Sequence, residues 1–253
     1  MTAKQKVIFC WSGGKDSALC LHHVLQSGRY EVLCLLTTLN DEFDRVSMHG
    51  VRASLLEAQA ASIGLPLEKV YVSRGSSNTQ YEERMSAAML KHKALGADTV
   101  IFGDIFLEDL RQWREDNLAK IGMKALFPLW KRDTRELIEE FISLGFRSVI
   151  CCVNDAWLDE SDVGRHIDAE FLQTIPPDVD PCGENGEYHS FAFAGPIFKQ
   201  PLRIELGEKV YRPLEPFAPA GVSASNSSTV CPSGPSRTKG FWFCDLLPAE
   251  ASA

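Results

Sequence analysis

The sequence lacks the features that would assign it to a membrane, to secretion or to a nucleic-acid surface. No apolar stretch approaches the roughly 18–20 residues that a membrane-spanning helix requires. The apolar run that ends at Trp11 is only five residues long, which is too short for the core of a signal peptide. The formal net charge is −8, so a broad electrostatic contact with phosphate backbones is not expected. We therefore expect a cytoplasmic protein without membrane contact, for which nucleic acid is not the expected partner.

Cysteine pairs are also missing. The chain has eight cysteines, and no two of them form a C-x-x-C pair. Cys182 and His189 stand seven positions apart without a second pair of ligands, so a structural zinc site is not expected. We expect reduced thiols that pack as small hydrophobic side chains.

The first 155 residues show a regular alternation of apolar runs and helical patterns. Five runs are almost continuously apolar: Val7–Trp11, Val32–Thr37, Lys69–Val72, Thr99–Phe102 and Ser148–Val153. Most helical patterns end before a glycine: Asp16–Ser27, Val51–Ile63, Tyr81–Leu95, Leu107–Ile121 and Asp133–Leu144. Continuous apolar strands are typical of a parallel sheet that is covered on both faces. The sequence thus predicts an α/β fold with a doubly wound parallel five-stranded sheet, whose ligand lies at the carboxyl ends of the strands.

Residues 156–253 follow a different pattern. We expect them to form a small C-terminal α+β extension, beside the α/β domain at 1–155. The pattern predicts a short helix at Asp162–Leu172 and a hairpin of Arg203–Tyr211 with Gly240–Leu246. The segment at about 213–239 is rich in Pro, Ser, Gly and Ala, and we expect a disordered insertion there.

A glycine-rich loop lies between the first apolar run and the first helical pattern. Its residues are Ser12, Gly13, Gly14, Lys15, Asp16 and Ser17. Glycines let the backbone approach an anion, the N–H groups of a helix start point toward it, and the helix dipole favours negative charge. A Walker A motif would need glycine at Phe9 and Ser or Thr at Asp16, so this phosphate loop is of another kind. It resembles the PP-loop of the adenine nucleotide α-hydrolase superfamily, whose members split ATP between the α and β phosphates.

A second segment follows the second apolar run. Met48 and His49 stand directly before the helix that begins near Val51, which places them at the same edge of the sheet as the phosphate loop. They are candidates for nucleotide contact. The alternative for His49 is a capping or solvated residue at a helix start.

A third segment begins where the fourth apolar run ends. Gly103 and Asp104 follow that run, so we expect Asp104 to point into the crevice at the carboxyl ends of the strands. Arg111, Arg114 and Glu115 lie on the next helix, where Arg111 and Arg114 share a face. The alternative is a solvated helix face with ordinary ion pairs.

The last segment combines carboxylates, an amide, a phenol and an imidazole on a loop that contains several glycines. It runs from Asp180 through Glu184 and Glu187 to His189. Packing does not readily explain this combination, whereas such groups bind Mg²⁺ or ammonium, orient an acceptor or accept a proton. A surface turn is the alternative.

At these positions the sequence resembles one family, the diphthine–ammonia ligases and their bacterial relatives, over roughly residues 5–200 and again in the final hairpin. The matching motifs are Ser12–Ser17, Met48-His49, Gly103-Asp104-Ile105, Arg114 to Asn117, Pro128-Leu129-Trp130 and Cys182–His189. The resemblance implies that ATP and ammonium amidate a carboxylate, which is diphthine on a translation elongation factor in eukaryotic and archaeal members. AMP and pyrophosphate are the other products. Ala194 stands where the family often has Asp, and the chain is similar to the short prokaryotic form, for which another acceptor is open.

The resemblance also implies roles for individual residues. The residues expected at the nucleotide are Ser12, Gly13, Gly14, Lys15, Asp16, Ser17, Met48, His49, Gly103 and Arg114. The residues expected to act in catalysis are Asp104, Glu115, Glu184, Glu187 and His189. Asp16 is in addition the expected ligand of Mg²⁺, and Glu184, Glu187 and His189 are the expected ammonia and acceptor pocket.

Two other functions remain open from the sequence. One is a tRNA-modifying PP-loop enzyme, against which the missing C-x-x-C pair and the acidic net charge count. The other is a regulatory module similar to universal stress proteins, which binds ATP without ligation. Such a module would not need the polar segment at 182–189.

Overall fold

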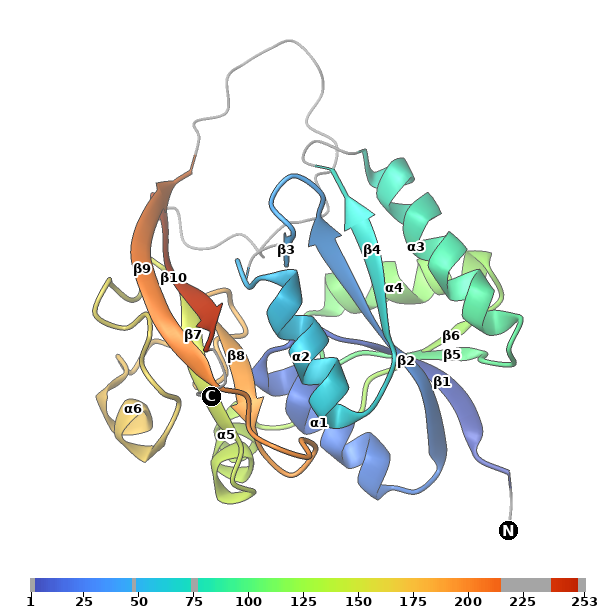
Figure 1. Cartoon of the computed structure of the whole chain (residues 1–253), viewed down its shortest axis with the longest axis horizontal. Coiled ribbons are helices and arrows are strands. Elements are labelled where there is room, and N and C mark those ends of the chain that lie inside the picture. Colours follow the sequence, from blue (N-terminus) through green and yellow to red (C-terminus); the bar gives the residue numbers. More distant parts are fainter. Residues whose placement is uncertain (1–2, 47–48, 74–76, 215–237, 250–253) are drawn as a thin grey trace.

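The computed structural model describes residues 3–46, 49–73, 77–214 and 238–249. Its larger sheet is centred on β1 (Gln5–Cys10), which lies between β2 (Tyr30–Asn40) and β5 (Thr99–Ile101). The sheet also contains β3 (Arg45–Val46), β4 (Leu67–Val72) and β6 (Lys124–Leu126). β4, β2, β1, β5 and β6 are parallel neighbours in that order, while β3 pairs antiparallel with the end of β2. The predicted five-stranded parallel sheet is confirmed (Figure 1).

Helices cover both faces of this sheet. They are α1 (Lys15–Gln26), α2 (Ala53–Ile63), α3 (Asn78–Lys93) and α4 (Glu108–Lys120). Side chains of β1 alternate between two core clusters: Val7 and Phe9 pack with residues of α1 and α2, and Ile8 packs with residues of α3 and α4. This alternation is the period-two pattern of a strand that is buried on both sides, and it confirms the doubly wound arrangement (Figure 1).

A second sheet lies beside the first and is antiparallel. Its strands are β7 (Arg147–Asn154), β8 (Tyr188–Ala194), β9 (Ile204–Pro213) and β10 (Gly240–Pro248), in the order β8-β7-β10-β9. The predicted hairpin is confirmed, because β9 pairs antiparallel with β10. Helices α5 (Thr134–Ser143) and α6 (Ala169–Thr174) belong to the same half of the chain.

The assignment of Ser148–Val153 to the parallel sheet is wrong. These residues form most of β7, which pairs with β8 and β10 in the second sheet. β7 is buried on both faces, so its apolar run is as continuous as that of a parallel strand. The fifth parallel strand is instead β6, whose three residues are too few to give a sequence pattern.

Most helix boundaries follow the predicted signals. Asp133 caps α5, accepting a hydrogen bond from the N–H of Glu136 at 3.0 Å. Gly64 ends α2 in the left-handed conformation, with φ at 84°. The predicted helix at Asp162–Leu172 is shorter, because Asp168 accepts a hydrogen bond from Phe171 N and so starts α6 only at Ala169.

The structure also bears on the expectations for membrane helices, cysteines and the insertion at about 213–239. Over the described residues, no helix has both the length and the apolar character needed to cross a bilayer. In the described ranges, free thiols are found at Cys10, Cys20, Cys34, Cys151, Cys182 and Cys244. The predicted disordered insertion falls largely on 215–237, which lie outside the described residues.

Candidate active site

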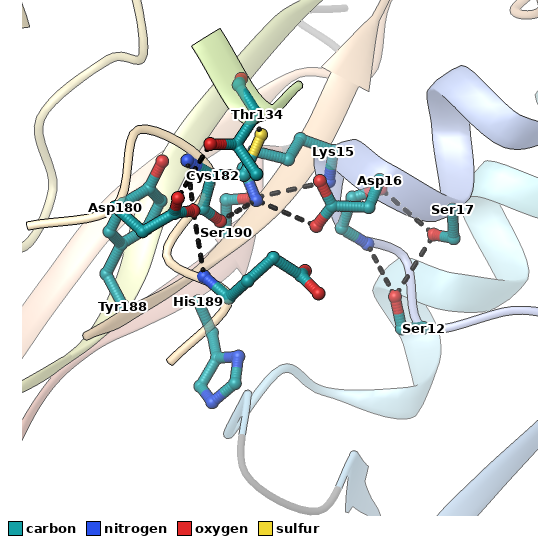
Figure 2. Close-up of polar contacts among 12 residues, drawn as sticks. Ser12, Lys15, Asp16, Ser17, Thr134, Asp180, Cys182, Tyr188, His189 and Ser190 are labelled. Atoms are coloured by element: carbon teal, nitrogen blue, oxygen red, sulfur yellow. Dashed lines mark hydrogen bonds and ion pairs between the residues drawn. The ribbon is translucent and has the colours of Figure 1, made fainter. Parts of the chain in front are cut away.

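The phosphate loop, residues 12–17, joins β1 to α1 at the carboxyl end of the central strand. Gly13 has a φ of +80°, and a Cβ there would lie 2.6 Å from Cδ2 of Leu56, so only glycine fits. Helix α1 starts after Gly14 without a side-chain cap, which leaves the positive end of its dipole for an anion. Ser12 Oγ accepts from the N–H of Gly14 at 3.3 Å and donates to Ser17 Oγ at 3.1 Å (Figure 2).

Lys15 is buried, with 3% of its surface exposed. Its Nζ lies 2.7 Å from Oδ2 of Asp16, donates to the carbonyl oxygen of Cys182 and lies 5.2 Å from the centre of the Tyr188 ring. Burial by itself lowers the pKa of Lys15, but Asp16 and Tyr188 outweigh it, and the net pKa is raised well above the usual value. Lys15 therefore stays charged, and it connects the phosphate loop to the segment around Cys182 (Figure 2).

The phosphate loop lines a cavity of about 370 Å³ between the two sheets. Most of the predicted site residues also line it, namely Ser12, Gly14, Lys15, Asp16, Ser17, His49, Gly103, Asp104, Arg114, Glu184 and His189. Among the residues that the structure describes, Gly13, Glu115 and Glu187 are not part of this lining. Met48 lies outside the described residues.

Gly103 and Asp104 follow β5 and lie against the start of α1. A Cβ on Gly103 would lie 3.2 Å from the backbone of both Asp16 and Ser17, so the absence of a side chain lets this loop approach the helix. Asp104 faces the cavity and forms an ion pair with Arg114, with 2.7 Å between Oδ2 and Nε. The Arg114 guanidinium also lies 4.3 Å from the centre of the Phe102 ring. Two predicted residues are thus joined into one rigid unit.

Glu115 takes no part in that unit. Its Oε1 accepts from Nε of Arg111 at 2.8 Å, four residues earlier on α4, and its side chain is 37% exposed. This contact matches the alternative of an ordinary ion pair on a helix face. The catalytic role predicted for Glu115 remains a prediction without a contact to the cavity.

The acidic loop, residues 180–187, holds its own shape with two of its carboxylates. Asp180 Oδ1 accepts from the N–H of Cys182 at 2.9 Å, and Asp180 Oδ2 accepts from Thr134 Oγ1 at 2.7 Å. Glu187 is fully buried and accepts from the N–H of Asp180 and from the N–H and side-chain amide of Asn185, at 2.9–3.0 Å. Such a carboxylate is satisfied by the loop itself, so the geometry of Glu187 is that of a positioning residue.

Glu184 differs from Glu187 because it faces the cavity. Burial, together with the negative charges of Asp16 and Asp104, raises its pKa to about 8, although Lys15 opposes the shift. A carboxyl group with that pKa both holds and releases a proton near neutral pH. The cavity therefore contains a carboxyl group whose pKa is compatible with proton transfer.

His49 and His189 also line the cavity, where the His49 ring lies beside Gly14 of the phosphate loop. Their rings stack with centres 4.6 Å apart and an interplanar angle of 27°. Burial lowers the pKa of His49 to about 4 and that of His189 well below its usual value, so both rings are neutral at pH 7. Within the described chain, Nδ1 of His49 and Nε2 of His189 have no hydrogen-bond partner, which suits contact with a bound molecule.

Two site residues were not predicted from the sequence. Ser190 Oγ accepts from the N–H of Lys15 at 3.2 Å, and Gln59 donates to the carbonyl oxygen of Gly13 at 2.9 Å. Ser190 follows the predicted motif directly, so a motif extended by one residue would have included it. Gln59 is a polar residue among buried neighbours of α2, Leu56 and Ala60, which is the only local signal it offers.

The cavity also allows a test of the predicted magnesium ligand. Over the described ranges, no three side chains of His, Cys, Asp and Glu are grouped as a metal cluster. Asp16 and Glu184 nevertheless both face the cavity, and burial raises the pKa of each carboxyl group. Mg²⁺ often takes one or two carboxylates and obtains its other ligands from phosphates and water. The residues present therefore fit an ion that arrives with a nucleotide.

Comparisons with known proteins agree on one family. The diphthamide synthase N-terminal domain matches residues 5–125, and the diphthamide synthase C-terminal domain matches 133–217. A diphthine–ammonia ligase of Danio rerio is 29% identical over 239 residues, which cover 85% of this chain and 92% of that protein. The human protein of that name is 25% identical over 231 residues, or 82% and 86% of the two chains. The Schizosaccharomyces pombe protein is 29% identical over 225 residues, which are 81% of this chain but 36% of that longer protein.

Proposed function

This chain belongs to the diphthamide synthase family, and on that premise we propose that it is an ATP-dependent ligase that amidates a carboxylate with ammonium. The reaction passes through an acyl-adenylate and releases AMP and pyrophosphate. Diphthine on a translation elongation factor is the first candidate acceptor, because the relatives are named diphthine–ammonia ligases. The cytoplasm is the proposed location. In this proposal residues 1–155 bind ATP, and residues 156–253 supply the ammonia and acceptor side.

One observation carries the proposal. The phosphate loop and the proton-holding carboxyl of Glu184 line the same cavity, and Lys15 connects the loops from which they come. A nucleotide-binding module without chemistry needs the first element but not the second. An amide-forming ligase needs both, because it must hold pyrophosphate and also accept a proton from the incoming nitrogen.

In the first half-reaction, a carboxylate oxygen of the acceptor attacks the α-phosphorus of ATP, and the bond to the β-phosphate oxygen breaks. Backbone N–H groups of the phosphate loop and the charged Lys15 hold the departing pyrophosphate. Arg114 stays beside the phosphates because Asp104 fixes it at 2.7 Å. The neutral rings of His49 and His189 line the same cavity, and we place the adenosine against them.

In the second half-reaction, ammonia attacks the acyl carbon and AMP leaves with the electron pair of the broken bond. The attacking nitrogen must first lose a proton, since NH₄⁺ has no lone pair. Glu184 is the proposed acceptor of that proton, because its pKa of about 8 suits a base at neutral pH. Glu187 and Asp180 keep the acidic loop in the shape that presents Glu184.

A magnesium ion would be held by Asp16, which lines the cavity together with the carboxyl groups of Glu184 and Asp104. It would neutralise charge on the phosphates. Asp16 also forms the ion pair that holds Lys15, so it contributes to phosphate binding by two routes.

The decisive experiment follows the products of labelled ATP with the purified protein, ammonium and candidate acceptors. AMP and pyrophosphate that appear only with ammonium and a carboxylate acceptor support the ligase. Dependence of AMP formation on tRNA would instead support a tRNA-modifying enzyme, and ATP that binds but stays intact would support a regulatory module. Either of these results overturns the proposal.

A pair of variants locates the chemistry within the cavity. Glu184→Gln is expected to bind ATP normally but to form amide more slowly, since the amide cannot take the proton. Glu139→Gln is the matched control, because Glu139 pairs with Arg135 on the surface of α5 and does not line the cavity. Equal activity of the two variants would remove Glu184 from the proposed chemistry.

A further inference from the structure

Gln59 is a fully buried polar residue on a helix that otherwise packs through apolar side chains. It lies on α2, beside Leu56 and Ala60, at the side of the phosphate loop that faces away from the cavity. Burying an amide costs free energy unless its donors and acceptors are paired. The hydrogen-bond partners of Gln59 therefore indicate why a polar residue occupies this buried position.

Each polar atom of the Gln59 amide is paired. Nε2 donates to the carbonyl oxygen of Gly13 at 2.9 Å and to that of Ala192 at 2.6 Å, which uses both of its N–H groups. Oε1 accepts from the indole N–H of Trp11 at 2.9 Å. The partners lie in the strand end that leads into the phosphate loop, in the loop itself and in β8. One side chain thus connects the loop to both sheets.

The direction of the Gly13 carbonyl has a consequence for the loop. A peptide bond is planar and trans, so the N–H of Gly14 points opposite to the carbonyl oxygen of Gly13. That oxygen accepts from Gln59 and from the N–H of Ala192 at 2.9 Å, both on the far side of the loop. The N–H of Gly14 accordingly points toward Ser12 Oγ, and both residues line the cavity.

The Gly13–Gly14 peptide lies between two residues that lack side chains, and such a peptide rotates more easily than others. A flipped peptide would aim a carbonyl oxygen, rather than an N–H, at the phosphates. We infer that Gln59 is a positioning residue, which holds the Gly13 carbonyl away from the cavity and so sets the phosphate loop for pyrophosphate. This role deepens the proposed function and rests on it for the identity of the ligand.

The inference is tested by the affinities of the protein for pyrophosphate, ATP and adenosine, measured by titration calorimetry without an acceptor. Gln59→Met keeps the volume of the side chain but removes both donors. We expect its Kd for pyrophosphate and for ATP to rise at least tenfold, while its Kd for adenosine changes less than twofold. A residue with a merely structural role would weaken all three ligands together or none of them.

Two further variants keep the test informative if Gln59→Met does not fold. Trp11→Phe keeps an aromatic ring of smaller size but removes the indole N–H that donates to Gln59, and it is expected to raise the Kd for pyrophosphate by a smaller factor. Leu137→Ala is the matched control, because Leu137 is buried on α5 and does not line the cavity. It should lower the melting temperature without changing the ratio of the pyrophosphate and adenosine affinities.

The outcomes separate this inference from the proposed function. Unchanged pyrophosphate affinity in the folded Gln59→Met and Trp11→Phe variants would overturn the role of Gln59. A wild-type protein that binds ATP and pyrophosphate but yields no AMP with any acceptor would overturn the ligase, while a selective loss of pyrophosphate binding in Gln59→Met would still support the positioning role.

Discussion

The phosphate loop and the acidic loop meet at Lys15, yet they are stabilised in opposite ways. The phosphate loop is held from behind through its backbone, at the carbonyl oxygen of Gly13, by Gln59 and β8. Its own polar groups remain directed at the cavity. The acidic loop is held from within, by Glu187 and Asp180, whose carboxylates accept hydrogen bonds from the loop's own N–H groups.

The difference shows that a high density of polar residues is no measure of reactivity. The acidic loop contains three carboxylates, but only Glu184 is directed at the cavity, while Glu187 and Asp180 hold the loop together. The phosphate loop has few functional side chains, and most of them line the cavity. Substitutions should therefore affect ligand chemistry in one loop and mainly folding in the other, and four predictions test that contrast.

The largest effect is expected at Lys15, where the two loops meet. Lys15→Met removes the charge that, in the proposed reaction, faces the departing pyrophosphate, and it also removes the contact with Cys182. Loss of one pre-organised group at such a position reduces a rate by about 10²–10³-fold. Pyrophosphate release is expected to fall by that factor, measured at saturating ATP. Lys131→Met is the control, because Lys131 pairs with Glu108 on the surface. A loss smaller than about threefold would contradict the role of Lys15.

The next effect should appear in stability and not in ligand binding. Glu187→Ala leaves the N–H groups of Asp180 and Asn185 without their acceptor in a buried place. Each lost hydrogen bond to a charged group costs about 1–3 kcal/mol, so unfolding should become easier by about 3 kcal/mol. ATP binding should persist, because Glu187 does not line the cavity, whereas amide formation should fail with the disordered acidic loop. Urea unfolding and product formation are the measurements. A normal rate of amide formation would exclude a role for the loop.

Those parts of the site that depend on local patterns could be predicted from the sequence. A strand, a glycine-rich turn and a helix start occupy consecutive positions, so the local pattern alone predicts the phosphate loop at 12–17. The same holds for Gly103 and Asp104 at the end of β5. The strand at 148–153 was recognised as a strand but placed in the wrong sheet, because an apolar run reports burial on both faces and not the identity of its neighbours.

The rest depends on contacts between distant parts of the chain. Gln59 meets its partners Gly13 and Ala192 across 46 and 133 positions, and no local pattern indicates such a contact. Glu184 and Glu187 look alike in the sequence, since both are acidic and flank the same Asn-Gly pair. The fold of the loop decides which of the two faces the cavity. That fold depends in part on Thr134 at the start of α5, which donates a hydrogen bond to Asp180.

A smaller effect tests the acidic loop through the response of Glu184 to pH. The pKa of Glu184 is raised from 4.5 to about 8 in the folded protein, mainly by burial. The folded state therefore holds the proton more tightly, and the associated stability is full below about pH 4.5 and lost as the pH rises through about 8. Glu184→Gln has no such proton. Its melting temperature, relative to the wild type, should rise between pH 5 and pH 8 and level off above that range. A difference that is independent of pH would show that the pKa of Glu184 is not raised.

The smallest effect concerns a pair of ion pairs close in sequence to His49, whose ring lines the cavity. Asp245 on β10 binds Arg45 at 2.8 Å and Arg52 at 2.5 Å, on either side of His49. Burial alone would raise the pKa of Asp245, but hydrogen bonds from Arg52 and Arg45 lower it to about 2. The contribution to stability is thus present above pH 3.8 and lost as the pH falls through about 2.

Because these side chains are partly exposed, Asp245→Asn should cost only about 1 kcal/mol of unfolding free energy at pH 7. The difference from the wild type should shrink toward pH 2, and the KM for ATP should rise by no more than about threefold, since His49 would keep its stacking partner His189. Urea unfolding at several pH values and steady-state kinetics are the measurements. A large loss of activity with unchanged stability would show instead that Asp245 acts on the ligand. The ion pairs of Asp245 would then serve ligand chemistry, as the phosphate loop does, and not folding, as most of the acidic loop does.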